Sequence, residues 1–560
     1  MKKLRWQLLI VILALAAIAL ILLGQQPSAI PPNVQTTPQP IAGGSYTEAL
    51  VGFPSRLNPL LDFYNQPDRD VDRLLYSSLI RFDEHGNPNP DLAESWGISQ
   101  DGTTYSFSIR QNARWHDGEP VTSQDVVFTV ELLRDENMPV PDDLRALWND
   151  IEVEAVNPSL VQFHLPEPLS PFLDYLTFGV LPEHLLGSLS TTDIVDAPFN
   201  LQPIGSGPYL LSQFIVENDQ IIGVELNAFD QYYFPRAFID KVVFRYYPDS
   251  ASALDAYKAG TVEGISQITP DVLTNALAEP GLSLYTSRLP QLTLVMFNLD
   301  NPRRPFFGES EIRHALMQAL NRQRMVNELL DGQAILANGP IFPGTWAYLD
   351  ADELPSYDVD AALETLKAAG YTIPAEGGNV RVKDDVSLRF TLLHPDDPIH
   401  TQIAEMIQDS WAQLGVKVEL EALPYPDLVS ALTARNYDAA LVDLNLTRSP
   451  DPDPYPFWHQ AQITGGQNYA QWNDRVASEY LEQARVTLDQ TERARLYRNF
   501  QVRFSRELPA LPLYYPVYTY AVSSRVQGVR VGPLFDPSDR LNYLPEWYLQ
   551  SAITEPSPAP

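Results

Sequence analysis

The clearest pattern of hydrophobic and polar positions lies between residues 436 and 458, where a predicted strand meets a proline-rich loop. One face of the strand carries Ala440, Val442, Leu444 and Leu446, and the other carries Leu441, Asp443 and Asn445. The prolines that follow, from Pro450 to Pro456, restrict the backbone and predict a stiff loop without helix. Because ligands of open α/β sheets bind beyond the carboxyl ends of strands, this junction is a candidate pocket wall. An ordinary solvated strand end is the alternative.

The same strand is the last element of a segment in which strand-like and helix-like hydrophobic patterns alternate. The pattern predicts strand 388–393, helix 401–414, strand 416–420, helix 426–434 and strand 437–446. A β-α-β-α-β unit of this kind joins parallel strands through helical crossovers, so this part of the chain is predicted to be an α/β lobe.

Similar patterns predict further elements upstream. Strands are expected at 47–51, 105–109 and 241–247, and a single helix is expected from Ile312 to Leu330, with Gly332 past its end. A cluster of glycine and proline at 202–209 marks a boundary between lobes.

Composition narrows the functional classes. A chain of 560 residues has room for about three or four structural units of ordinary size. Its net charge of −33 argues against nucleic acid and anionic membrane surfaces as partners. The absence of cysteine excludes disulfides, thiolate metal sites and cysteine nucleophiles.

The N-terminus predicts membrane targeting. A basic stretch from Met1 to Arg5 precedes an almost continuously apolar stretch from Trp6 to Leu23. We expect residues 1–24 to be an uncleaved anchor, with a cleaved signal as the alternative. Residues 25–44 are rich in proline and are predicted to be an extended tether, and residues 551–560 a disordered tail.

Few motifs point to chemistry. His394, Asp396, Asp397 and His400 could converge on a divalent ion, and Asp451 and Asp453 resemble the start of a calcium loop; in both places a solvated loop is the alternative. Paired carboxylates of a secreted hydrolase stay open, because any acidic chain offers such pairs. Trp458, Tyr469 and Trp472 are either core residues or platforms for a ligand.

Several motifs in one order carry a family resemblance. They are Pro90-Asp91-Leu92-Ala93-Glu94-Ser95-Trp96, Asp101-Gly102-Thr103-Thr104-Tyr105-Ser106-Phe107, Trp115-His116-Asp117-Gly118 and Pro203-Ile204-Gly205-Ser206-Gly207-Pro208-Tyr209. Together they closely resemble the extracellular solute-binding proteins of peptide/nickel ABC transporters, family 5.

The resemblance implies an α/β, two-lobed periplasmic-binding-protein-like fold of type II, in the large cluster that carries an extra domain, with the ligand cleft between the lobes. Carried onto this chain, lobe I comprises residues 45–80, 203–290 and 525–550. The extra domain comprises residues 81–202, and lobe II residues 291–524.

The resemblance also implies a binding mode. Asp443, Leu444 and Asn445 are expected to pair with the main chain of a peptide, with Tyr64 and Asn65 facing them from lobe I. Oligopeptide binders of the family carry an aspartate shortly after this strand, and here that position falls on Thr447 or Arg448. Asp451 or Asp453 is expected to replace that charge, or Arg448 meets a carboxylate of the ligand. Trp458 and Trp472 would suit a sugar.

The function so implied is the extracytoplasmic solute-binding component of an ABC importer, which captures peptides and delivers them to a membrane permease. An oligosaccharide, a nickel chelate or another solute is the alternative within the same role. A secreted hydrolase and a signalling receptor domain are alternatives from other classes. We expect a monomer without catalytic activity or cofactor.

Overall fold

The computed structural model describes residues 40, 42–350, 354–445 and 450–550. Ala42–Leu549 form one compact unit, which is the subject of everything below. The predicted anchor (1–24), most of the tether, the tail (551–560) and Arg448 lie outside the described residues. Within the described ranges, no helix combines the length and the apolar composition needed to cross a membrane.

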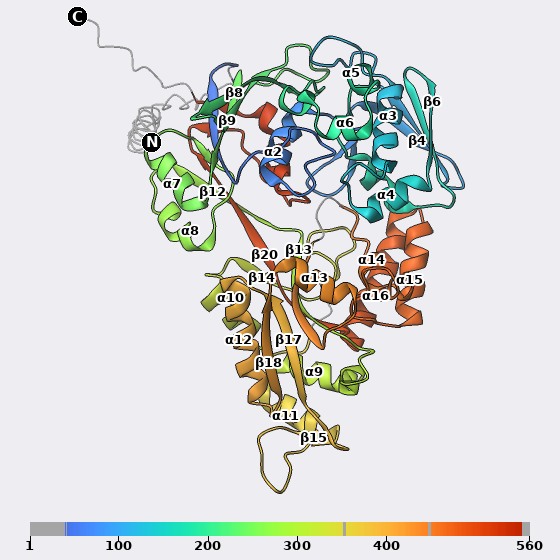
Figure 1. The fold of residues 1–560 in the computed structure, drawn as a ribbon, viewed down its shortest axis with the longest axis vertical. Helices are drawn as coiled ribbons and strands as arrows, with labels where there is room; N and C mark the ends of the chain where they lie inside the picture. Colours follow the sequence, from blue (N-terminus) through green and yellow to red (C-terminus); the bar gives the residue numbers. More distant parts are fainter. Residues whose placement is uncertain (1–39, 41, 351–353, 446–449, 551–560) are drawn as a thin grey trace, which may run out of the picture. The chain divides into compact units, whose positions relative to one another are not determined.

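Two sets of strands share the long strand β20 (Ala510–Ser523). The order is β18-β17-β19-β13-β20-β11-β1-β10-β9-β8, with β12 and β14 also pairing with β20 (Figure 1). The first half of β20 pairs with β13 (Gln291–Phe297) and β14 (Ala334–Leu336), and the second half pairs with β11 (Gly264–Ile265) and β12 (Leu282–Arg288). We call the strands on the β11 side lobe I and those on the β13 side lobe II.

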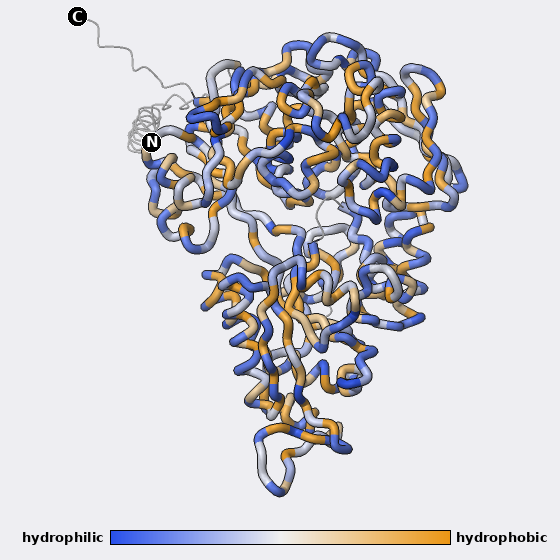
Figure 2. The backbone as a smooth tube through the Cα atoms, in the orientation of Figure 1, coloured by the Kyte–Doolittle hydropathy of each residue, from blue (hydrophilic) through white to orange (hydrophobic). Residues whose placement is uncertain are grey.

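Lobe II contains the predicted β-α-β-α-β unit. Its elements are β17 (Arg389–Pro395), α12 (Pro398–Ala412), β18 (Lys417–Leu423), α13 (Tyr425–Thr433) and β19 (Ala439–Asn445). β17 pairs in parallel with both β18 and β19, as the alternation predicts. Figure 2 shows hydrophobic colouring along these strands, which matches their burial.

Lobe I is built on β1 (Ser45–Val51), which pairs in parallel with β10 (Lys241–Tyr247). β9 (Gln220–Ala228) and β8 (Tyr209–Glu217) continue the sheet in antiparallel order. The helix α2 (Gln66–Leu75) begins where the side chain of Asn65 accepts the amide hydrogen of Asp68. Pro67 occupies its first turn, where no amide hydrogen is needed.

A separate antiparallel sheet runs in the order β4-β5-β7-β6. Its strands are β4 (Ala93–Ile98), β5 (Thr104–Ile109), β6 (Glu152–Asn157) and β7 (Leu160–His164), and α3 (Ser123–Arg134) and α4 (Asp142–Asn149) accompany it. Thr122 and Asp125 form a capping box at the start of α3. The hydrophobic core of this sheet is continuous with that of lobe I. The residue boundaries of the lobes and the extra domain stay a prediction.

The motif residues His116, Gly205 and Gly207 secure the C-terminal end of α2. A Cβ atom on Gly205 would lie 1.9 Å from the carbonyl oxygen of Leu75, so only glycine fits there. His116 Nδ1 accepts the amide hydrogen of Gly205 at 3.1 Å, and Nε2 lies 3.2 Å from the oxygen of Gly207. Burial lowers the pKa of His116 to about 4, so its imidazole is neutral.

Two expectations were wrong in detail. The predicted helix from 312 to 330 is two helices, α9 (Ser310–Gln318) and α10 (Arg322–Leu329), because the Asn321 side chain caps a new start by accepting the amide hydrogen of Arg324. The proline-rich loop contains the short helix α14 (Tyr455–Trp458), since Pro456 is tolerated in a first helical turn.

The remaining α-helices and strands complete the fold. They are β2 (Ile80–Phe82), β3 (Pro88–Pro90), α5 (Glu183–Leu186), α6 (Thr191–Val195), α7 (Ser250–Lys258), α8 (Pro270–Leu277), α11 (Val359–Ala368), β15 (Val382–Lys383), β16 (Val386–Ser387), α15 (Arg475–Val486), α16 (Gln490–Glu507), β21 (Val526–Gln527) and β22 (Tyr548–Leu549).

Candidate ligand-binding site

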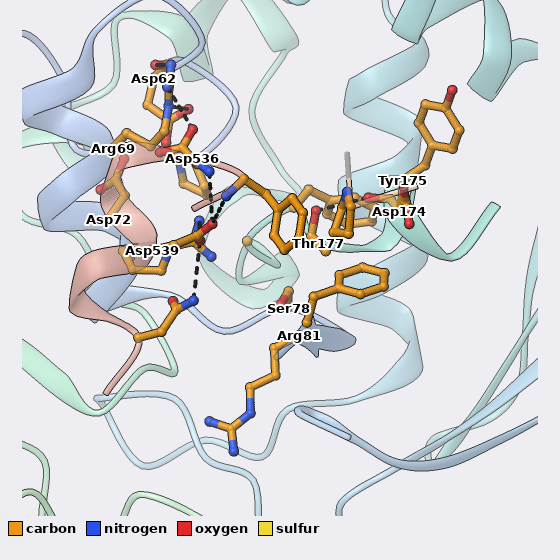
Figure 3. A pocket seen from close by; sticks show the side chains of 18 of the residues that line it. Asp62, Arg69, Asp72, Ser78, Arg81, Asp174, Tyr175, Thr177, Asp536 and Asp539 are labelled. Carbon is orange, nitrogen blue, oxygen red and sulfur yellow. Dashed lines mark hydrogen bonds and ion pairs between the residues drawn. The ribbon is translucent and has the colours of Figure 1, made fainter. Parts of the chain in front are cut away.

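A cavity of about 600 Å³ lies beside α2 (Figure 3). Lobe II contributes Asn445, Pro450 and Gln467 to its wall. The rest of the lining comes from the loop 59–64, α2, residues 76–84, Leu133 of α3, residues 141–148, the 3-10 helix η1 (Ser170–Leu176) with the following residues 177–179, and residues 532–543. Segments far apart in the sequence therefore meet at one cavity of the size that small-molecule ligands occupy.

The cavity wall is acidic. Among the described lining residues, eight carry carboxylates and three carry guanidinium groups. Arg69 Nη1 donates to Asp536 Oδ2 at 2.9 Å, and Arg73 Nη2 lies 3.0 Å from Asp539 Oδ1. Two of the three arginines are therefore paired with carboxylates of the wall itself, and the negative charge predominates.

Arg69 also positions the loop before α2. Its Nη2 donates to the carbonyl oxygens of Phe63 at 2.6 Å and Asp62 at 3.1 Å. These charge-assisted bonds fix the backbone next to Tyr64, whose side chain lines the cavity and is 84% exposed. Tyr64 is thus held at the cavity with its ring available to solvent or a ligand.

Asp72 also lines the cavity, but unlike Asp536 and Asp539 it is not paired with an arginine in the described part of the chain. Its side chain is only 3% exposed, and neither carboxylate oxygen has a hydrogen-bond partner among the described residues. Burial raises the pKa of this carboxyl well above its ordinary value, and the carboxylates of Asp62 and Asp68 raise it further, while the backbone amide of Asn58 and the charge of Arg69 act in the opposite direction. Figure 3 shows Asp72 beside Arg69, across the view from Tyr175 and Thr177.

Aromatic side chains form much of the remaining wall. Tyr76, Trp148, Tyr175 and Phe178 all line the cavity. The rings of Trp148 and Phe178 meet edge to face with their centroids 5.6 Å apart, so these two side chains pack directly against each other. The cavity consequently combines an apolar aromatic surface with an acidic one.

The strand β19 reaches the cavity with part of one edge unpaired. It pairs with β13 over its whole length, from Ala439 to Asn445. Its ladder with β17 comprises only the pairs at Ala439 and Ala440 among the described residues. From Leu441 to Leu444 this second edge pairs with no strand among the described residues, so it is a candidate edge for an added strand of main chain.

Three of the residues predicted to bind ligand lie at or beside the cavity. Tyr64 and Asn445 line it. Asn65 caps α2, and its Nδ2 donates to the carbonyl oxygen of Phe53 at 3.2 Å. The side chain of Asn65 is thereby engaged in positioning the helix.

Asp443 and Leu444 do not line the cavity with their side chains. Asp443 accepts a hydrogen bond from Thr293 Oγ1 at 2.5 Å, and its other oxygen lies 3.2 Å from His400 Nε2. Leu444 is buried in the core of lobe II. Ligand binding by the backbone of Asp443 and Leu444 stays a prediction.

The two acids of the proline-rich loop are engaged by arginines. Asp451 lies 2.6 Å from Arg493 Nη1, and Asp453 Oδ2 accepts a hydrogen bond from Arg485 Nε at 2.7 Å. The amide of Asp451 also donates to Asp174 Oδ2 at 2.7 Å, which connects this loop to the cavity wall. Ligand binding by these acids stays a prediction, as it does for Arg448.

Trp458 and Trp472 occupy core positions. They are 2% and 5% exposed and pack edge to face with Phe504. Of the two alternatives for these aromatics, the structure places both in the core of lobe II. A contact with ligand stays a prediction.

The two histidines considered as metal ligands, His394 and His400, each interact with a different oxygen of the protein. His394 Nδ1 is 2.8 Å from the oxygen of Pro395, while His400 Nδ1 is 2.6 Å from Asp397 Oδ2. Across the described parts of the chain, no group of three or more histidine, aspartate or glutamate side chains is arranged to hold a metal ion.

Four wall residues were not predicted from the sequence: Arg69, Asp72, Asp536 and Asp539. One signal was available: α2 carries Asp68, Asp70 and Asp72 at alternate positions, and alternate positions on a helix cannot all face the same way. At least one of these acids had to face the interior.

Comparison with known proteins adds the family context. Residues 87–466 match the model of the family described as bacterial extracellular solute-binding proteins, family 5 Middle. The oligopeptide-binding protein AppA of Bacillus subtilis (strain 168) is 26% identical over 524 residues, which are 91% of this chain and 92% of that protein.

Two solved structures are similar over almost their full length. The structure of the oligopeptide-binding protein AppA from Bacillus subtilis in complex with a nonapeptide has a TM-score of 0.71 at 25% identity, covering 91% of this chain and 100% of that chain. NikZ from Campylobacter jejuni in complex with Ni(L-His) has a TM-score of 0.71 at 26% identity, covering 90% of this chain and 99% of that chain. These likenesses confirm the predicted two-lobed α/β fold.

Proposed function

Because the chain belongs to the bacterial extracellular solute-binding proteins of family 5, we propose that it captures peptides outside the cytoplasm and delivers them to the permease of an ABC importer. Similarity to relatives that bind oligopeptides supports the choice of peptide as solute. The fold supports the delivery role, since two lobes that share one long strand can close around a ligand by hinge motion.

The observation that carries the peptide assignment is the edge of β19. From Leu441 to Leu444 this edge pairs with no strand among the described residues, so it can accept a peptide main chain as an additional strand. Main-chain pairing is indifferent to side-chain identity. In this mode Asp443, Leu444 and Asn445 supply backbone groups, and Tyr64 contacts the ligand from the opposite wall. The remaining space of about 600 Å³ accommodates side chains and water.

We place the protein on the outer side of the cytoplasmic membrane. The basic and apolar N-terminal stretch, residues 1–24, would anchor it or be removed after secretion, and residues 25–44 would tether the folded unit. The protein acts as a monomer that presents its closed, loaded form to the permease.

Native mass spectrometry of the purified protein tests this function. Molecules that co-purify are released under denaturing conditions and identified. A heterogeneous set of short peptides is the expected result. A single sugar, a nickel chelate or another non-peptide species would overturn the peptide assignment and leave the importer role in place. Turnover of a released peptide, abolished by single acid substitutions, would instead indicate a hydrolase.

A further inference from the structure

Three carboxylates on α2 have three different environments. Asp68 accepts the amide hydrogens of Ser55 and Arg56 at 2.9 and 2.8 Å. Asp70 is held by Arg540 through two hydrogen bonds of 2.8 and 2.7 Å. Asp72 is as deeply buried, yet both of its oxygens are without a hydrogen-bond partner among the described residues. Native proteins rarely leave such a group unsatisfied unless it has a functional role.

The position of Asp72 defines where a partner could come from. It lines the cavity, while the neighbouring arginines of α2 are directed to other carboxylates, Arg69 to Asp536 and Arg73 to Asp539. Both oxygens of Asp72 are almost inaccessible to solvent in this structure, so a molecule in the cavity can supply the missing donor only by displacing the side chains that cover them. A cationic donor is favoured over a neutral one, because the described lining carries eight carboxylates and three guanidinium groups.

The aromatic part of the wall completes the match. Tyr76 and Phe178 line the same cavity as Asp72, and their rings can pack against an aliphatic stem. Aromatic faces also attract cations. An ammonium or guanidinium group at the end of a short alkyl chain fits both surfaces.

We propose that Asp72 anchors a subsite for a positively charged group of the ligand, an alkylammonium or guanidinium, and that the protein therefore prefers basic peptides. This inference rests on the proposed peptide function for its substrate and adds the charge of that substrate. The cation would come either from a lysine or arginine side chain or from the peptide's α-amino group.

Binding of four synthetic tripeptides to the full-length purified protein tests the subsite by isothermal titration calorimetry. They are Ala-Lys-Ala, its uncharged analogue Ala-norleucine-Ala, and the N-acetylated form of each. With a side-chain cation, the wild type should bind both lysine peptides about tenfold or more tightly than the norleucine peptides. Asp72→Asn should remove that preference. With an α-amino cation, acetylation should weaken binding to the wild type and have no effect on Asp72→Asn.

Asp143→Asn is the matched control. It removes one carboxylate from an exposed position of the same wall, so it reports the general field of the cavity. Its effect on lysine peptides should be less than about threefold, because an exposed charge is screened by solvent. Circular dichroism should show Asp72→Asn folded, since the amide is uncharged and of nearly the same shape.

A second readout distinguishes ligand contact from a structural role. Because burial raises the pKa of Asp72, pairing with a cation should release a proton from the wild type. The binding enthalpy should then depend on the ionisation enthalpy of the buffer, and this dependence should be absent in Asp72→Asn.

The outcomes separate the two proposals. If the protein binds peptides and Asp72→Asn binds all four with wild-type affinity, the subsite is refuted and the peptide function stands. The probe 1,5-diaminopentane carries the cation without a peptide backbone. If no peptide binds but this diamine binds the wild type and not Asp72→Asn, the subsite stands and the peptide function fails. If neither the peptides nor the diamine bind, both proposals fail.

Discussion

Asp70 and Asp72 lie two residues apart on α2, are both almost fully buried, and differ completely in what surrounds them. Asp70 belongs to a sealed network in which Arg540, with 0% of its side chain exposed, bridges it to Glu48. Glu48 also accepts hydrogen bonds from the hydroxyls of Tyr46 and Tyr520 at 2.7 and 2.9 Å. Asp72 lines a cavity, and among the described residues no arginine forms a hydrogen bond with its almost inaccessible oxygens.

One side of α2 stabilises the fold, and the other side lines the cavity where we propose that ligand binds. In the sealed network each charge is satisfied within the protein, so the network joins β1, α2, β20 and the segment around Arg540 into one structure. At the cavity, an unsatisfied carboxyl reduces stability and keeps interaction energy available for a ligand. Substitutions on the two sides should therefore have opposite effects.

The largest expected effect is that of removing the central cation. Arg540→Met leaves Glu48 and Asp70 buried without a counter-charge, and we expect it to lower the free energy of unfolding by about 3–5 kcal/mol. Urea unfolding monitored by tryptophan fluorescence measures the change. The control is Arg530→Met, whose partner Glu546 is on the surface; it should lower the free energy by less than about 0.5 kcal/mol. Equal losses of stability in the two variants would contradict the prediction that the buried arginine stabilises the fold more than the surface arginine.

Asp70→Asn tests the same buried network by removing the negative charge that pairs with Arg540. The amide keeps one acceptor for Arg540 but loses the bidentate, charged pairing, so we expect unfolding to be easier by about 2 kcal/mol. The same urea titration provides the measurement. A variant as stable as the wild type would show that the remaining partner, Glu48, is sufficient for Arg540.

The sequence predicts elements that depend on neighbouring residues better than it predicts contacts between residues far apart in the chain. The β-α-β-α-β unit of lobe II follows from its alternating periodicities, and the glycines at 205 and 207 belong to a recognisable motif. No strand was predicted at β20, because Pro512 and Pro516 interrupt a strand pattern. The structure accommodates Pro512 near a shift of register between Thr293 and Leu294 on the neighbouring strand.

The candidate site was only partly predictable for the same reason. Tyr64 and Asn445 lie at the cavity and were named from the family resemblance. The difference between Asp70 and Asp72 depends on Arg540, which lies 470 residues further along the chain than Asp70. No local pattern indicates which acid on a helix will meet a partner that distant.

Asp72→Asn should have the opposite sign to Asp70→Asn. The raised pKa means that folded wild-type protein holds a proton which the unfolded chain releases, so its stability is full below the ordinary aspartate pKa and falls as the pH rises toward the raised value. The amide has no such dependence. We expect Asp72→Asn to be more stable by about 1 kcal/mol at pH 7.5 and to lose that advantage at pH 4. Thermal and urea unfolding at both pH values would show whether the difference follows the predicted direction.

The smallest expected effect on stability is that of substituting His400. Its half-buried imidazole lies between the carboxylates of Asp397 and Asp443. Burial lowers the pKa of this imidazole, but the two carboxylates outweigh burial and raise it above its ordinary value. The stability it contributes is therefore full below the unfolded pKa of about 6.5 and is lost as the pH rises through the raised folded value.

We accordingly expect His400→Gln to be less stable than the wild type by about 0.5–1 kcal/mol at pH 6 and equal to it at pH 9, as measured by urea unfolding. His85→Gln, at an exposed position, is the control and should change stability at neither pH. A deficit that persists at pH 9 would assign the role of His400 to packing. A deficit confined to low pH would show that Asp443, like Asp70, is paired with a cation of the protein itself. Asp72 would then differ from both, because we propose that its cationic partner belongs to the ligand.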